Sequence, residues 1–277
     1  MTAPRPPLFD FRTGLMRRQR AARMGGDVFL ARGTAEGLAD RLAAVTRRFE
    51  RGLLVGDVVP EEMQGFAAQW TKGDFNAAET LDVPEQGFDL AVSVFSLQAI
   101  NDLPGALVQI RRALKPDGLF VGALFGGGTL NELRTSFAHA ESETTGGISP
   151  RVSPFADVRD MGGLLQRAGF ALPVTDVERT QVRYGDFSTL VRDLRAHGLT
   201  NVLSERRRTF LRRDTLAAML AHYRGHHADA GKLAATFEIV YLTGWAPHDS
   251  QQKPLQPGSA KARLAQALGT VELKTRN

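Results

Sequence analysis

The chain of 277 residues contains no cysteine, which excludes disulfides, thiolate metal sites and a cysteine nucleophile. Long apolar runs are also missing. The most apolar segments are shorter than the roughly 18 to 20 residues that a membrane-spanning helix needs, and they lie at 88–100, 119–125 and 237–245. With 43% hydrophobic residues the chain can still fill a core without covalent cross-links. We expect a soluble protein whose chemistry uses oxygen and nitrogen groups.

Acidic residues are scarce in the first 51 positions, which hold eleven arginines and only five carboxylates. The remaining chain is close to neutral, so the net charge of +5 comes from this basic N-terminal segment. Together with the arginines at 206–208 and 212–213, the segment suits either an ordinary solvated face or a surface for an acidic partner. Charge alone does not decide between the two.

Apolar runs at 51–57, 87–97 and 119–125 predict strands that are buried on both faces, as in a parallel sheet. Helical spacing over 103–114 joins the last two of them into a strand-helix-strand unit, and the mixed segment 66–74 is a further candidate strand. These patterns predict an α/β protein. Other helices are predicted at 8–24, 34–50, 155–168, 186–197 and 212–224.

The last third of the chain has a different pattern, because residues alternate between apolar and polar at 174–185, and a second strand is predicted at 235–245. These two strands can pair across the long connection between them. The predicted organisation is a basic helical arm over 1–50, one α/β domain over 51–247 with an insertion at 126–154, and a polar tail over 248–277.

Three consecutive glycines, Gly126–Gly128, follow the third apolar run. The next four residues have the S/T-x-x-E pattern of a capping box, which predicts a helix that starts at Thr129 with Glu132 completing the box. A glycine turn between a strand and a helix N-terminus suits either an anion or substrate site or a tight structural turn. Both interpretations stay open.

The segment 88–134 begins with Phe88-Asp89-Leu90 and contains Arg112-Ala113-Leu114-Lys115-Pro116-Asp117-Gly118. It resembles class I S-adenosylmethionine-dependent methyltransferases, in which F-D-L-V opens a strand and R-x-L-K-P-x-G ends the following helix. Residues 8–23, 137–170 and 236–260 look like the complex I assembly factor 5 group and its alphaproteobacterial relatives, and more distantly like malonyl-carrier-protein O-methyltransferases. The resemblance implies a Rossmann-like, mostly parallel sheet with an antiparallel C-terminal strand pair.

The resemblance also implies an S-adenosylmethionine site after the first strand, where the family has the glycine-rich turn D-x-G-x-G-x-G. Here the turn keeps one glycine, Gly56, followed by Asp57-Val58-Val59-Pro60, and the region 57–86 is shorter than in the family, so its second and third strands are expected to be reduced. The candidate cofactor ligands are Gly56 and Asp57 in the turn, Asp74 for the ribose, Asp82 for the adenine, and Ser93 and Leu97 at the end of the second apolar run.

Catalytic residues do not stand out. His139 shares a helix face with Glu143, and Glu141 lies between them, but exposed helices often carry such groups. His222 and His226 have helical spacing without the glutamate of an H-E-x-x-H motif, so no metal site is expected. Gln98, next to Leu97, is a further pocket candidate because open α/β sheets bind ligands at the carboxyl ends of their strands.

Two functions follow from these features. By resemblance, the chain is an enzyme of the family that modifies a protein or acyl substrate, by methylation or by hydroxylation of an arginine in a respiratory complex I subunit. The alternative is a non-enzymatic assembly or binding factor, because the turn after Gly56 is degenerate. Nucleic acid is not expected as a partner, since Ser96-Leu97-Gln98-Ala99 replaces the N/D-P-P-Y/F motif of nucleic-acid methyltransferases. The likeness begins at Leu8, which favours a bacterial cytoplasm over an organelle.

Overall fold

The computed structural model describes residues 6–26, 28–56, 60–155 and 157–252. Residues 1–247 belong to one compact unit and residues 248–277 to a second. In the second unit the described residues, 248–252, contain a short turn in which Nδ1 of His248 lies 2.6 Å from Oγ of Ser250. No helix in the described ranges is long and apolar enough to cross a bilayer.

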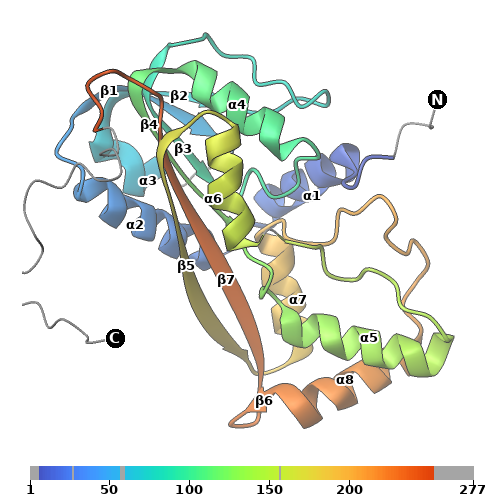
Figure 1. The fold of residues 1–277 in the computed structure, drawn as a ribbon. Helices are drawn as coiled ribbons and strands as arrows, with labels where there is room; N and C mark the ends of the chain where they lie inside the picture. The colour runs from blue at the N-terminus through green and yellow to red at the C-terminus, as the bar shows by residue number, and fades with distance from the viewer. Residues whose placement is uncertain (1–5, 27, 57–59, 156, 253–277) are drawn as a thin grey trace, which may run out of the picture. The chain divides into compact units, whose positions relative to one another are not determined.

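A mixed seven-stranded sheet forms the centre of the first unit (Figure 1). Its strands follow the order β2-β1-β3-β4-β7-β5, and a short β6 pairs with β7. The neighbours from β2 to β4 are parallel, whereas β7 is antiparallel to both β4 and β5. The strands are β1 Phe49–Val55, β2 Ala67–Gly73, β3 Phe88–Val94, β4 Leu114–Phe125, β5 Ala171–Tyr184, β6 Ala228–Asp229 and β7 Lys232–Trp245. The predicted fold class is confirmed, including the late antiparallel pair.

Two layers of helices explain why the central strands are continuous apolar runs. All seven residues of β3 are buried, with Leu90, Val92 and Val94 in one core cluster and Ala91 in the other. The first cluster contains residues of α2, α5, α7 and α8, and the second contains residues of α4 and α6. The helices are α1 Phe11–Met24, α2 Phe29–Ala43, α3 Pro60–Met63, α4 Leu103–Ala113, α5 Asn131–Thr145, α6 Val158–Arg167, α7 Phe187–Ala196 and α8 Arg213–His227.

The two sequence motifs that carry the resemblance meet in the structure as an ion pair. Asp89, which is 6% exposed, lies 2.8 Å from Nζ of Lys115 and accepts backbone hydrogen bonds from Glu50 and Arg51, each at 3.0 Å. This contact joins the starts of β1, β3 and β4. The motif residues therefore stabilise the sheet at the end opposite to the carboxyl ends of its parallel strands.

The region between β1 and β3 is reduced, as the short sequence predicted. Helix α3 has four residues, the 3-10 helix η1 covers Gln64–Phe66, and the described residues between β2 and β3 form only turns and an isolated bridge from Phe75 to Leu81. A doubly wound sheet usually has a further strand outside the second one. In the described part of this chain β2 is the edge.

The predicted bounds of two helices were wrong. Helix α2 covers Phe29–Ala43 rather than 34–50, and it cannot extend to position 50 because Phe49 already begins β1. Helix α5 begins at Asn131 and has no capping box. Thr129 instead pairs with the backbone of Glu238 through two 3.0 Å hydrogen bonds, and the Glu132 carboxylate accepts from the backbone N–H of Thr236 at 3.1 Å. Thr129 and Glu132, which were expected to cap the helix, instead connect its start to β7.

Helix α5 continues to Thr145, well into the predicted insertion at 126–154, and Glu141 anchors its end. Glu141 is 0% exposed, accepts from the Ser149 backbone at 2.6 Å and lies 2.5 Å from the Arg151 guanidinium. Burial opposes ionisation of this carboxyl, but the hydrogen bonds from Ser149 and Arg151 and the charge of Arg151 outweigh it and lower its pKa. The ion pair fixes the segment 149–151 against α5.

We expect Glu141→Ala to lower the free energy of unfolding at pH 7 by about 3 kcal/mol, because Arg151 then loses its carboxylate inside the protein. Because the pKa of Glu141 is lowered in the folded state, its ionised carboxylate stabilises the fold at pH values above the ordinary pKa of 4.5. That stabilisation is lost as the pH falls through the pKa of the folded state. In urea unfolding, the difference in unfolding free energy between the native chain and Glu141→Ala should therefore become smaller in acid.

The matched control is Glu143→Ala, on the same helix but with a side chain that is 57% exposed. This substitution should change the free energy of unfolding by no more than about 0.5 kcal/mol. An equal loss for both variants, or a difference that persists unchanged in acid, would contradict the assigned role of Glu141.

Candidate functional site

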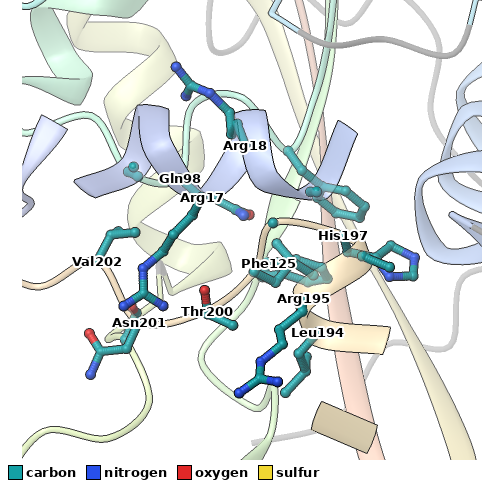
Figure 2. Close-up of a pocket in the computed structure, with 18 of the residues that line it drawn as sticks. Arg17, Arg18, Gln98, Phe125, Leu194, Arg195, His197, Thr200, Asn201 and Val202 are labelled. Atoms are coloured by element: carbon teal, nitrogen blue, oxygen red, sulfur yellow. The ribbon is translucent and has the colours of Figure 1, made fainter. Parts of the chain in front are cut away.

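A cavity of about 1080 Å³ opens at the carboxyl ends of the parallel strands. The strands contribute Leu54, Lys72, Val94 and Phe125, and Gly56 lines the cavity directly after β1. Helix α1 and the segment 194–202 at the end of α7 form another part of the wall (Figure 2). This is the edge of an open α/β sheet at which ligands bind.

Gly56, the single glycine of the turn, occupies a position where the structure requires a glycine. Its φ of +82° lies in the left-handed region, and a Cβ there would lie 1.9 Å from Oγ of Ser96. Its backbone N–H donates to the carbonyl of Gly73 at 2.8 Å, so the end of β1 is fixed against β2. The backbone at Gly56 therefore lies close to the segment after β3, and both line the cavity.

Four phenylalanines form an aromatic wall in the cavity. Phe125 stacks on Phe95 with ring centroids 4.1 Å apart, and it also contacts Phe155 and Phe237, at 5.8 and 6.1 Å. Phe95 has a φ of 54°, a strained conformation for a residue with a side chain. Sequence reasoning missed this wall, although Phe95 and Phe125 could have been found as aromatic residues at the ends of buried strands.

Among the predicted ligands, Gly56 lines the cavity and Ser93 and Leu97 do not. Ser93 is fully buried and its hydroxyl has no hydrogen-bond partner among the described residues, and Leu97 belongs to the core cluster that contains α4. Gln98 lines the cavity, and its buried Oε1 also has no partner in the described part of the chain. Asp57 lies outside the described residues, as do Val58 and Val59.

The two predicted carboxylates that the structure describes, Asp74 and Asp82, do not line the cavity. Asp74 follows β2, accepts a hydrogen bond from the backbone of Phe75 at 2.9 Å and lies 3.9 Å from the Arg18 guanidinium. Asp82 is exposed. The described residues that line the cavity include no aspartate or glutamate. Of the predicted ligands, Gly56 therefore lines the cavity, whereas a carboxylate is not found among the described lining residues.

The cavity wall is instead strongly basic. Its lysine and arginine side chains are Arg17, Arg18, Lys72, Arg151, Arg195, Arg206 and Arg207. Several have carboxylate partners: Arg206 lies 3.1 Å from Asp10, and Arg207 lies 3.7 Å from Glu141. These charges favour an acidic group in at least part of the cavity.

The glycine turn 126–128 holds a carboxylate of the chain itself. Oε1 of Glu238 accepts from the backbone of Gly128 at 3.1 Å, and Oε2 lies 2.7 Å from Nε of Arg179. A Cβ at Gly126 would lie 2.4 Å from the same Glu238 carboxylate. Of the two open interpretations, the structure supports the tight structural turn.

His139 lies outside the cavity, in a cluster of histidines between α5 and α8. Its Nε2 lies 3.3 Å from Glu143, its ring centroid is 4.3 Å from that of His222, and His222 stacks on His226 at 4.2 Å. Over the described ranges, no three histidine or acidic side chains are arranged to hold a metal ion. The cluster supplies no general base to the cavity.

Comparison with known proteins connects this geometry to a family. Residues 28–173 match the family described as methyltransferase domain. The chain is 46% identical over 188 residues to the mitochondrial arginine-hydroxylase NDUFAF5 of Danio rerio, which covers 68% of this chain and 58% of that protein. It is 39% identical over 173 residues to malonyl-(acyl-carrier protein) O-methyltransferase of Xylella fastidiosa, with 62% and 57% covered. The chain thus spans little more than half the length of these relatives.

A solved structure supports the fold alone. The YcgJ protein of Bacillus subtilis aligns with a TM-score of 0.50 at 12% identity, over 78% of this chain and 99% of that chain. At this identity the sheet and its helices are shared, while ligands and chemistry are not implied.

The histidine cluster gives a titration that can be measured directly. Burial and the neighbouring His226, His139 and His227 lower the pKa of His222 below its usual value of 6.5. We expect His226→Asn to raise that pKa, because one of the repelling charges is removed. Glu143→Gln should lower it further, since Glu143 favours the charged form. NMR titration of the imidazole signals tests both directions, and shifts of the same sign in the two variants would contradict the assignment.

Proposed function

We propose that this chain, which belongs to the methyltransferase domain family, is an S-adenosylmethionine-dependent enzyme that modifies a protein partner. The observation that carries the proposal is the large cavity at the carboxyl ends of β1 to β4, with Gly56 in its wall. The similarity to arginine-hydroxylases supports an arginine side chain as the target. By the resemblance of its sequence to the assembly-factor group, the partner is a subunit of respiratory complex I.

Two described residues fit a nucleoside cofactor. Gly56 lies in the cavity wall, where its missing Cβ leaves room for Ser96, and Gln98 has a buried amide oxygen without a hydrogen-bond partner among the described residues. When bound, S-adenosylmethionine supplies an electrophilic methyl group. The chain's own contribution is positioning, for which rigid neighbours such as the stacked Phe95 and Phe125 are suited.

A non-enzymatic binding factor is the second candidate, and a specific observation favours it. The described lining residues include no carboxylate, and Asp74 lies beside Arg18 instead. Loss of the ribose ligand would leave a cavity and a partner surface without efficient cofactor binding. In this case the same partner binds, but its residues are not modified.

Titration calorimetry with S-adenosylmethionine tests the first candidate. We expect binding by the native chain, and a loss of about fivefold in affinity for Gln98→Leu, because one hydrogen bond to the ligand disappears. Gln166→Leu, an exposed position on α6, is the matched control and should leave the affinity unchanged. Absence of heat with millimolar ligand would rule out the cofactor-dependent enzyme.

Mass spectrometry of the partner after incubation separates the remaining outcomes. An added methyl group on an arginine supports methyl transfer from S-adenosylmethionine. An added oxygen atom supports hydroxylation, for which the incubation must also contain molecular oxygen and a two-electron reductant. An unmodified partner that still forms a complex with the chain supports the binding factor.

A further inference from the structure

The end of the cavity between α1 and α7 carries an excess of positive charge that Asp10 offsets only in part. Arg17 of α1 and Arg195 of α7 both line the cavity. No carboxylate within the described ranges lies within 4.0 Å of either guanidinium, whereas Arg206 beside them pairs with Asp10 and lies 2.7 Å from Oγ1 of Thr13. Arg17 and Arg195 therefore remain available to an acidic ligand.

The direction of Arg17 separates this end from the Gly56 end. Arg17 and Arg18 follow each other on α1, and Figure 2 shows their side chains pointing in opposite directions. Arg18 lies 3.9 Å from Asp74, at the end of β2. Arg17 turns toward the segment that carries Thr200 and Asn201 (Figure 2).

Arg17 also occupies an unfavourable environment in the ligand-free chain. It is half-buried, and burial together with the nearby charges of Arg206, Arg20 and Arg195 lowers its pKa. Like charges that are partly removed from water repel more strongly than charges at the surface. A bound anion would relieve this repulsion and would gain charge-assisted hydrogen bonds from planar guanidinium groups.

Polar residues lie beside Arg17, and apolar residues lie beside Arg195. Leu194 and Phe125 lie in the same part of the wall, and Phe125 belongs to the aromatic wall with Phe95, Phe155 and Phe237. A small inorganic anion would leave this surface uncovered. The geometry fits a ligand with a charged group at one end and an apolar body at the other.

We propose that this end of the cavity binds an organic anion with an apolar body, whose carboxylate or phosphate pairs with Arg17 and is attracted by the charge of Arg195. The site goes beyond the proposed function, because it uses residues that are separate from Gly56 and Gln98 and does not require S-adenosylmethionine to bind.

Calorimetry on the full chain with four probes tests the ligand class. Decyl phosphate and decanoate carry both features, decanol lacks the charge, and inorganic phosphate lacks the apolar body. We expect decyl phosphate or decanoate to bind at least about tenfold more tightly than either of the other two. The two charged probes also distinguish a phosphate from a carboxylate. Equal affinity for decanol, or for inorganic phosphate, would overturn the proposal.

Substitutions locate the site. The double variant Arg17→Gln, Arg195→Gln should lose about tenfold or more in affinity for the charged probe and keep its affinity for decanol. Arg23→Gln, an exposed position on α1 outside the cavity wall, is the matched control. If the double variant does not fold, as judged by circular dichroism, Arg195→Gln alone tests the same expectation, because Arg195 is exposed. An equal loss in the control would refute the site.

The same variants keep this proposal apart from the proposed function. Gln98→Leu should leave decyl phosphate binding unchanged, and the arginine variants should leave S-adenosylmethionine binding unchanged. If the arginine variants weaken both ligands equally, the arginines bind the carboxylate of the cofactor and the separate anion site does not exist. If the native chain binds the charged probe but no S-adenosylmethionine, the proposed function fails and the anion site stands.

Discussion

The antiparallel pairing of β7 is the constraint on which the rest of the structure depends. One part of this strand pairs with β4, from Leu119 opposite Trp245 to Phe125 opposite Ile239, and almost its whole length pairs with β5. The strand thereby joins the parallel half of the sheet to β5. It also carries Glu238 to the glycine turn after β4 and places Phe237 against Phe125. Displacing β7 would therefore disturb both the start of α5 and the aromatic wall.

The sheet was predictable because its physical cause is local. A strand that is covered on both faces must be apolar throughout, and β3 and most of β4 show this in their sequence and in their burial. The contacts of Thr129 and Glu132 were not predictable in the same way. Both residues have the pattern of a helix cap, but their hydrogen bonds go to β7, more than 100 residues later. Local pattern cannot reveal a competing partner so distant in the chain.

The candidate site was predictable in position and less so in its residues. The carboxyl end of β3 was expected to face a ligand, and Gln98 does lie in the cavity wall, but Ser93 faces the core on the side of α4. Alternation along a strand decides which face a residue occupies. Because β3 is buried on both faces, its burial does not mark the face next to the cavity, and Ser93 is buried like its apolar neighbours. Arg17 and Arg195 come from helices outside the sheet, so only the folded chain brings them to one cavity.

The electrostatics of the cavity bear on the loss of the glycine-rich turn. A sulfonium cofactor brings positive charge into a wall that already contains several arginines and, among its described residues, no carboxylate. Aromatic faces can hold a cation, and Phe95 and Phe125 offer them near Gly56. Arg17 and Arg195, by contrast, attract an anion. The cavity thus has an aromatic region that suits a cation and a basic region that suits an anion.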